Sequence, residues 1–143
     1  MNEKIYIDWH EFHTHVKTLA EKLKSKEHKF NRIIAVSRGG LIPAGILAYE
    51  MNIRNCETIN FSSYDDDYMR ADEEIEIKNE LFSVDSQTLI IDDLADSGRT
   101  LKILRKHYPD AYIACVYAKP KGIEAADCFV QDLPDKWVVF PWD

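Results

Sequence analysis

The sequence predicts an α/β fold in which a mainly parallel sheet is flanked by helices. Short apolar runs typical of buried strands alternate along the chain with stretches of helical periodicity. Polar, glycine-containing segments follow these strands, at the carboxyl ends where open parallel sheets bind ligands. At 143 residues the chain has the size of one ordinary domain with its own core, and no linker divides it. We therefore expect residues 1–143 to form a single domain.

The first half of the chain contains two helical patterns and two strand-like runs. Apolar residues recur at helical spacing over residues 9–24, and Asp8 is a suitable N-cap. The run RIIAV (32–36) predicts a short buried strand, and a second helix is expected over roughly 41–51. CETINF (56–61) is the next strand-like run. This order is the one that builds a parallel sheet.

The second half begins with a charged segment and then returns to the same alternation. Residues 62–76 carry many acids and no sustained apolar period, which is typical of a disordered loop or a functional lid. Residues 88–91 predict a strand, 98–107 a helix and AYIACVYA (111–118) another buried strand. After Lys121 the chain becomes rich in proline and tryptophan.

Composition narrows the class of protein. The net charge of −7 argues against a nucleic-acid binder and against a polybasic membrane surface. No apolar stretch approaches the length of a membrane span, so no integral span is expected. The three cysteines are scattered, without a C-x-x-C pair, and indicate reduced thiols in a reducing compartment. These features predict a cytoplasmic protein.

The most informative stretch is TLIIDDLADSGRT (88–100). Its apolar run ends in Asp92 and Asp93, and an unpaired buried charge is expensive, so a ligand that satisfies both carboxylates is expected. The turn from Asp96 to Thr100 offers backbone amides, two hydroxyls and a glycine before a helix, which suits a phosphate monoester. A helix N-cap would explain one of these residues but not the acid pair. The chain lacks G-x-x-x-x-G-K-[ST] and G-x-G-x-x-G, which excludes P-loop and dinucleotide sites.

A family resemblance follows from these residues. LIIDDLADSGRT resembles the phosphoribosyl-diphosphate signature of type I phosphoribosyltransferases: apolar residues, two acids and a D-[ST]-G-x-T turn. The resemblance covers nearly the whole chain and is closest to the bacterial xanthine-guanine phosphoribosyltransferases, through IIAVSRGGLIPAGILAYEMNIR, SSYDDD, AKP and the closing W…PWD. PDKWVVF is also similar to the base-binding strand of hypoxanthine-guanine enzymes. The resemblance implies the type I phosphoribosyltransferase fold, with a mobile flap and a small C-terminal hood for the base.

The resemblance also implies a site for phosphoribosyl diphosphate. Asp92 and Asp93 would face the ribose hydroxyls and the shell of a Mg²⁺ cofactor, with Asp143 near the same metal ion. Charged hydrogen bonds from a vicinal diol to carboxylates are of the strong kind. The 5′-phosphate would be held by the turn residues Asp96, Ser97, Gly98, Arg99 and Thr100, where Arg99 stands in place of the glycine of close relatives.

Two further segments would complete the donor site. Ser37, Arg38 and Gly39 follow a buried strand, and their residue types alone allow either a plain strand-to-helix turn or an anion site. The resemblance implies diphosphate binding there, with a cis peptide between Ser37 and Arg38. Residues 62–76 alone suggest a solvated loop, and the resemblance implies a flap that closes over diphosphate with Arg70 at its arginine position.

Three residues near the end of the chain would form the base site by resemblance. Lys119 would donate to the purine O6, Trp137 would stack on the ring, and backbone groups around Val138 would contact the 2-position. Without the family, a solvated lysine and a core tryptophan are the simpler interpretations.

The implied reaction transfers the 5-phosphoribosyl group from its 1-diphosphate to N9 of a 6-oxopurine and releases diphosphate. Asp96 is the expected general base. The choice among guanine, xanthine and hypoxanthine stays open, and the implied assembly is a homodimer or homotetramer. The alternative is a regulator of the same fold that binds nucleotide or phosphoribosyl diphosphate without catalysis.

Overall fold

A five-stranded sheet forms the centre of the protein, as the apolar runs of the sequence predict. The computed structural model describes residues 3–27, 29–63 and 75–143. All neighbours in the sheet are parallel, in the order β3-β2-β6-β7-β8. The strands are β2 (Arg32–Val36), β3 (Cys56–Ile59), β6 (Thr88–Ala95), β7 (Tyr112–Ala118) and β8 (Gln131–Asp132).

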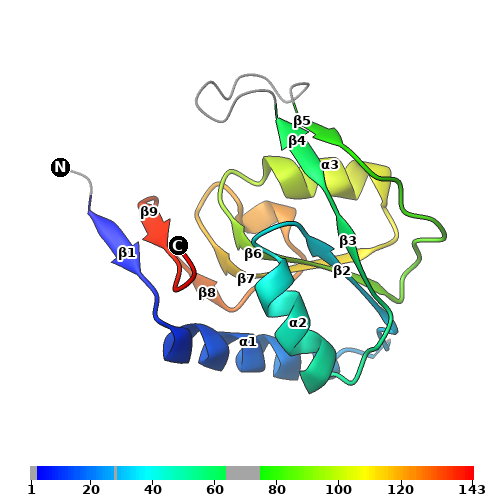
Figure 1. Cartoon of the computed structure of the whole chain (residues 1–143), viewed down its shortest axis with the longest axis horizontal. Coiled ribbons are helices and arrows are strands. Elements are labelled where there is room, and N and C mark those ends of the chain that lie inside the picture. Colours follow the sequence, from blue (N-terminus) through cyan, green and yellow to red (C-terminus); the bar gives the residue numbers. More distant parts are fainter. Residues whose placement is uncertain (1–2, 28, 64–74) are drawn as a thin grey trace.

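Helices cover both faces of this sheet, which confirms the predicted α/β class (Figure 1). α1 (Trp9–Lys24) and α2 (Leu41–Glu50) lie on one face and α3 (Arg99–His107) lies on the other. A short 3₁₀ helix (Ile123–Ala125) packs beside α3.

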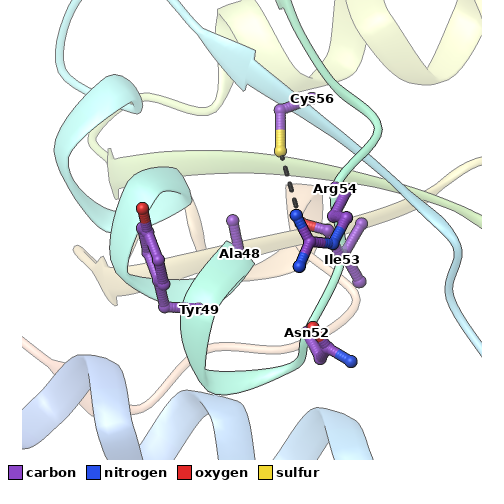
Figure 2. Close-up of a pocket in the computed structure, with 6 residues that line it drawn as sticks. All are labelled: Ala48, Tyr49, Asn52, Ile53, Arg54 and Cys56. Carbon is purple, nitrogen blue, oxygen red and sulfur yellow. Dashed lines mark hydrogen bonds between the residues drawn. The ribbon is translucent and has the colours of Figure 1, made fainter.

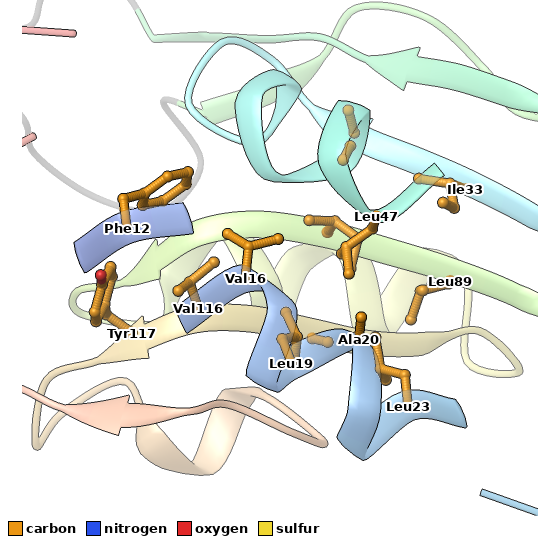
Figure 3. Packing of buried hydrophobic residues seen from close by; sticks show 14 of the residues in the cluster. Phe12, Val16, Leu19, Ala20, Leu23, Ile33, Leu47, Leu89, Val116 and Tyr117 are labelled. Carbon is orange, nitrogen blue, oxygen red and sulfur yellow. The ribbon is translucent and has the colours of Figure 1, made fainter. Parts of the chain in front are cut away.

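Each face has its own apolar core. Figure 3 shows the larger one, where Val16 and Leu19 of α1 and Leu47 of α2 pack against Leu89 of β6. The second core lies under α3, around Leu101 and its neighbours on the other face of the sheet. Alternate residues of a buried strand feed the two cores, because successive side chains point to opposite faces.

The first helix agrees with its prediction in both bounds and cap. Asp8 Oδ1 accepts a hydrogen bond from the backbone N–H of Glu11 at 2.8 Å, and the lysines of the last turn oppose the negative end of the helix dipole. The buried residues of α1 recur three and four apart, as an amphipathic helix requires.

Two strand predictions were wrong in their bounds. The strand predicted over 88–91 continues to Ala95, because β6 keeps pairing with β7 as far as Ala118. The run predicted as one strand over 56–61 divides into β3 and β4 (Phe61–Ser63), and β4 pairs antiparallel with β5 (Ile75–Ile77). This hairpin brings together the two ends of the predicted flap, whose residues 64–74, including Arg70, lie outside the described residues.

The two ends of the chain form a separate small sheet that the sequence did not predict. β1 (Lys4–Tyr6) pairs parallel with β9 (Trp137–Val139), so that Ile5 lies opposite Val138. The N–H of Ile7 extends this pairing by donating to the carbonyl of Val139 at 3.0 Å. In Figure 1 the small sheet stands beside the central one, past the carboxyl ends of its strands. Within the described residues, no helix is both long enough and apolar enough to cross a membrane.

Candidate active site

The predicted donor-site segments meet at the carboxyl edge of the central sheet. β2 and β6 are neighbours, with Ile34 beside Ile90, so the turn after β2 lies against the end of β6. A Cβ built on Gly39 would lie 2.5 Å from Asp93 Oδ2. Only glycine therefore allows the backbone of this turn to come so close to that carboxylate. The peptide between Ser37 and Arg38 is cis, as the resemblance implied.

Gly40 fixes the same turn to the sheet. Its N–H donates to the carbonyl of Val36 at 2.8 Å, and a Cβ at this position would lie 2.4 Å from the carbonyl oxygen of Ile91. Gly40 also precedes the first residue of α2, and the N–H of Leu41 donates to the carbonyl of Arg38 at 2.9 Å. The double glycine thus places Arg38 at the edge where β2 and β6 end.

Asp92 and Asp93 are two adjacent, half-buried acidic residues near the end of β6. The N–H of Asp93 donates to Asp92 Oδ1 at 2.8 Å. Burial raises the pKa of Asp92 well above its usual range, and the neighbouring charge of Asp93 adds to this effect. Burial also raises the pKa of Asp93, and the charge of Asp143 contributes in the same direction. Both carboxylates would therefore be stabilised by a ligand that donates hydrogen bonds or carries positive charge.

The turn after β6 has the shape of an anion site. It lines a small pocket of about 90 Å³ that reaches from Asp92 to Leu101. Gly98 has a φ of 85°, in the left-handed region that favours glycine, and α3 begins at the next residue. Ser97 Oγ accepts from the N–H of Arg99 at 3.3 Å. The residues predicted for the 5′-phosphate therefore lie together at a helix N-terminus, where backbone N–H groups favour anions.

Lys119 and Asp96 each directly follow one of two neighbouring strands, β7 and β6, and come together there. The Lys119 ammonium lies 3.4 Å from Asp96 Oδ2, and the N–H of Lys119 donates to the carbonyl of Ala95 at 2.9 Å. The lysine side chain is 8% exposed, whereas the aspartate side chain is 65% exposed. The simpler interpretation of Lys119 as a solvated lysine is therefore wrong, since its ammonium is buried and paired at the edge of the site.

Gly122 is a residue of this region that the sequence analysis did not single out. A Cβ built there would lie 2.2 Å from the carbonyl oxygen of Ala95. The absence of a side chain lets the turn after Lys119 pack on the end of β6. The sequence does contain a pattern that indicates a turn at this position, because Gly122 comes shortly after a predicted strand and close to a proline and two lysines.

Trp137 and Val138 lie on β9, at some distance along the chain from the phosphate turn. Trp137 is 68% exposed, so the interpretation as a core tryptophan is wrong, and Val138 is buried. β9 is followed by an aromatic cluster in which Phe140 and Trp142 stack at 4.6 Å and Phe12 of α1 meets Trp142 edge-on. This cluster anchors the strand that carries the predicted base-binding residues.

The last residue of the chain reaches back toward the acid pair. Asp143 Oδ2 accepts from the N–H of Phe140 at 2.9 Å, and its charge is close enough to raise the pKa of Asp93. Within the described part of the chain, no cluster of three or more His, Cys, Asp or Glu side chains has the arrangement of a metal site. Carboxylate oxygens suit Mg²⁺, which proteins usually hold by one or two carboxylates together with substrate phosphates. The acid pair fits a magnesium ion that binds together with an anionic substrate.

Comparisons with known proteins agree with this geometry. The model of the phosphoribosyl transferase domain family matches residues 3–143. A xanthine-guanine phosphoribosyltransferase of Idiomarina loihiensis is 42% identical over 99% of this chain and 88% of its own length. A purine phosphoribosyltransferase of Pyrococcus horikoshii superposes with a TM-score of 0.81 at 31% identity, covering 98% of this chain and 94% of its own.

A third relative extends the comparison to another bacterium. The xanthine-guanine-hypoxanthine phosphoribosyltransferase of Helicobacter pylori has a TM-score of 0.79 at 26% identity and covers 98% of this chain and 94% of its own. The family model, the curated relative and the solved structures thus match almost the whole chain, including both strand ends that carry the acids and the glycines. With the fold and the strand-end site already in agreement, the chain belongs to the phosphoribosyl transferase domain family.

Proposed function

We propose that this protein is a purine salvage enzyme that transfers the 5-phosphoribosyl group from 5-phosphoribosyl 1-diphosphate to N9 of a 6-oxopurine and releases diphosphate. The observation that carries the proposal is the half-buried pair Asp92 and Asp93, which lies against the glycine turn at Gly39 and beside the pocket before α3. A sugar that bears hydroxyls, a diphosphate and a 5′-phosphate supplies the partners that these three features need.

Each part of the sugar donor has a suitable partner in this arrangement. The ribose hydroxyls would donate to Asp92 and Asp93, whose pKa values burial raises in the ligand-free protein. The 5′-phosphate would occupy the turn at the start of α3, formed by Asp96, Ser97, Gly98, Arg99 and Thr100. The diphosphate would lie on the turn formed by Ser37, Arg38 and Gly39, with Arg70 of the flap as a further contact.

The cofactor of this proposal is Mg²⁺. Asp92 and Asp93 would hold it together with donor oxygens, Asp143 would lie nearby, and the ion would neutralise negative charge on the departing diphosphate. The planar guanidinium of Arg38 would donate hydrogen bonds from two of its N–H groups to the same diphosphate. The Coulombic cost of bringing an anionic donor to two carboxylates is removed when this positive charge is present.

The acceptor site follows from the pairing of Asp96 with Lys119. A carboxylate oxygen and an ammonium 3.4 Å apart match the N7–H and O6 groups on one edge of a 6-oxopurine. As the bond from C1 to the diphosphate oxygen breaks and C1 bonds to N9, the imidazole proton passes to Asp96 and the bond electrons leave with diphosphate. Trp137 would stack on the ring, and the backbone around Val138 would contact the 2-position.

The names of the matched relatives support a purine as the acceptor, since all three are purine enzymes. The thiols Cys56, Cys115 and Cys128 are free, which fits the reducing cytoplasm that we propose as the site of action.

A general base contributes about 10²–10⁴-fold to such a reaction, and closure of a flap excludes water from the cationic transition state.

The test is diphosphate release with guanine, xanthine, hypoxanthine, adenine and uracil, each with and without Mg²⁺. We expect Mg²⁺-dependent release with the 6-oxopurines and little with adenine, because the Lys119 ammonium can donate to O6 but not to an exocyclic amine. Uracil should also give little release, because a pyrimidine has no imidazole N–H for Asp96 to take. Preferential use of adenine would contradict the base site, and binding of the sugar donor without release with any base would favour a regulator.

A further inference from the structure

A histidine and a tyrosine outside the candidate site form a polar pair at the edge of the larger core. The Tyr117 hydroxyl and His15 Nδ1 share a hydrogen bond of 2.8 Å, and the two rings meet edge-on with their centroids 5.3 Å apart. Tyr117 is fully buried on β7, whereas His15 is half-buried on α1. Within the described residues, His15 is the only hydrogen-bond partner of this hydroxyl. The pair therefore ties β7 to α1.

The hydroxyl of Tyr117 needs an explanation, because a phenylalanine would fill the same space without a polar atom. Among the described residues of the larger core, Tyr117 is the one buried side chain that carries a polar group. Burial raises the pKa of Tyr117 well above its usual value, and the charges of Glu11 and Asp8 act in the same direction, so the hydroxyl keeps its proton. A buried hydroxyl without a partner is costly, whereas a satisfied one fixes a single arrangement of its surroundings. The hydrogen bond thus holds the ring in one orientation.

The ring of Tyr117 adjoins both parts of the predicted base site. Along β7, Lys119 follows two residues later. Across the core, the centroid of the Tyr117 ring lies 6.0 Å from that of Phe140, which is the first residue after β9. Phe140 in turn stacks on Trp142 at 4.6 Å. The strand that leads to the lysine and the strand that carries the stacking tryptophan therefore share one buried support.

Phe12 of α1 completes this support. Its ring centroid lies 6.4 Å from that of Tyr117, 6.3 Å from that of Phe140 and 5.0 Å from that of Trp142. Figure 3 shows Phe12 and Tyr117 at one end of the larger core. His15 follows Phe12 by three residues, so both lie on the same side of α1. One turn of α1 therefore contacts Tyr117 at its ring and at its hydroxyl.

We propose that His15 and Tyr117 are positioning residues for the purine, because their hydrogen bond fixes the ring that sets the place of β9 relative to Lys119. This inference rests on the proposed function, since it states what the pair does for the base site of that reaction. Neither side chain takes part in the chemistry. A purine that stacks on Trp137 and accepts from Lys119 needs both groups in register, and such contacts depend on geometry to within about 0.5 Å.

Steady-state kinetics on the full chain tests this role through the split between the two substrates. Tyr117→Phe keeps the ring and removes the hydroxyl, so the Michaelis constant for the purine should rise about 3- to 10-fold, as expected for the loss of one hydrogen bond. The value of kcat and the Michaelis constant for the sugar donor should stay within about twofold of the parent. The matched control is Tyr49→Phe, which removes the same hydroxyl from a 91% exposed side chain beside the pocket at the end of α2 (Figure 2).

Variants of His15 test whether the hydrogen bond itself is responsible. His15→Leu removes the partner and should raise the Michaelis constant for the purine by a similar factor, with His13→Leu, at an exposed position of α1, as its control. His15→Asn places an amide atom near the position of Nδ1 and should recover most of the parent's affinity for the purine. The double variant His15→Leu/Tyr117→Phe should be no worse than His15→Leu alone, because the two residues act through one bond. Additive losses, or equal losses for both substrates, would contradict the proposal.

Hydrogen exchange in the ligand-free protein tests the same pair without any reaction. Tyr117→Phe and His15→Leu should each speed the exchange of backbone N–H groups in residues 137–142, while β6 keeps the protection that it has in the parent. A parent that releases no diphosphate with any purine would refute the proposed function, and the exchange result would then decide by itself whether the pair holds this segment. Unchanged exchange in residues 137–142, or faster exchange with an unchanged Michaelis constant for the purine, would overturn the inference.

Discussion

The donor end and the base end of the candidate site are built in different ways. The donor end consists of Asp92 and Asp93 on β6 and of two short turns, residues 37–40 and 96–100, that follow neighbouring strands of the central sheet. The base end consists of β9, which pairs with β1 from the opposite end of the chain and lies outside the central sheet. The first is held by backbone contacts that only glycine permits, and the second by strand pairing and an aromatic cluster.

Because of this difference, we expect binding of the sugar donor and binding of the base to depend on different parts of the protein. The donor end is part of the sheet, so a change at Asp96 or Asp92 should alter the chemistry or the charge balance without moving the strands. The base end rests on a two-stranded sheet of three-residue strands, and an isolated pair of strands is at best marginally stable in water. We therefore expect the affinity for the base to respond to changes far from the base, and the affinity for the donor to be less sensitive.

The largest effect is expected from Asp96→Asn. Asn keeps the shape of the side chain but cannot take up the imidazole proton, so kcat should fall about 10²–10⁴-fold while the Michaelis constant for the donor changes little. Steady-state kinetics with a saturating purine measures this, and Asp110→Asn, at an exposed acid, is the control. Turnover within a few-fold of the parent would remove Asp96 from the role of general base.

Trp137→Ala should affect the base alone. Stacking of an aromatic side chain on a base contributes about 1–3 kcal/mol, so the Michaelis constant for the purine should rise roughly 5- to 150-fold. The constant for the sugar donor should stay close to that of the parent. Because Trp137 is 68% exposed, the melting temperature should also stay close to that of the parent, and Trp137→Phe should retain most activity. A strongly destabilised Trp137→Ala would instead indicate that the ring supports the fold.

Removal of residues 1–6 tests whether the base end depends on the opposite end of the chain. Without β1, β9 loses its hydrogen-bonded neighbour, and a few backbone hydrogen bonds at about 1 kcal/mol each correspond to roughly a tenfold or larger rise in the Michaelis constant for the purine. The Michaelis constant for the sugar donor should change much less. Lys4→Ala, which removes an exposed side chain and keeps the pairing, is the matched control. Equal losses for both substrates would mean that the two ends of the site are not independent.

The same contrast explains what could be predicted from the sequence. The strands around Ile34 and Ile90, the glycine turn and the acid pair lie in short contiguous stretches, so their periodicity predicted the sheet. The assignment of the donor end to these stretches came from the family resemblance that the same residues carry. β1 has only three residues and no alternation long enough to detect, and its partner is at the other end of the chain. Pairings of this kind are fixed by tertiary contacts, which local patterns do not contain.

The extent of β6 was missed for a related reason. The run TLII is apolar, and the change to acidic residues at Asp92 suggested that the strand ended there. The backbone instead stays in the sheet to Ala95, because β7 offers partners as far as Ala118 and strand pairing does not require apolar side chains. The consequence matters for function, since the two carboxylates sit on rigid strand backbone rather than on a loop.

The smallest effect is expected for the stability of the ligand-free protein in Asp92→Asn. Burial raises the pKa of Asp92 above its unfolded value, so the folded state binds this proton more tightly than the unfolded state does. The contribution of the Asp92 carboxyl to the free energy of unfolding is therefore fully present below about pH 4, and it is lost as the pH rises through the pKa of the folded state. Asn cannot ionise, so the variant should be the more stable protein at neutral pH, by about 3–6 °C if the gain is about 1 kcal/mol.

The pH dependence of this difference distinguishes charge from packing. Melting temperatures of the parent and Asp92→Asn, measured from acid to mildly alkaline pH, should converge in acid and separate as the pH rises. Adding the sugar donor with Mg²⁺ should stabilise the parent more than the variant, because hydroxyls and positive charge satisfy the carboxylate that burial penalises. A constant difference at every pH would mean that Asp92 acts through its shape, and the donor end would then resemble the base end in depending on packing rather than on charge.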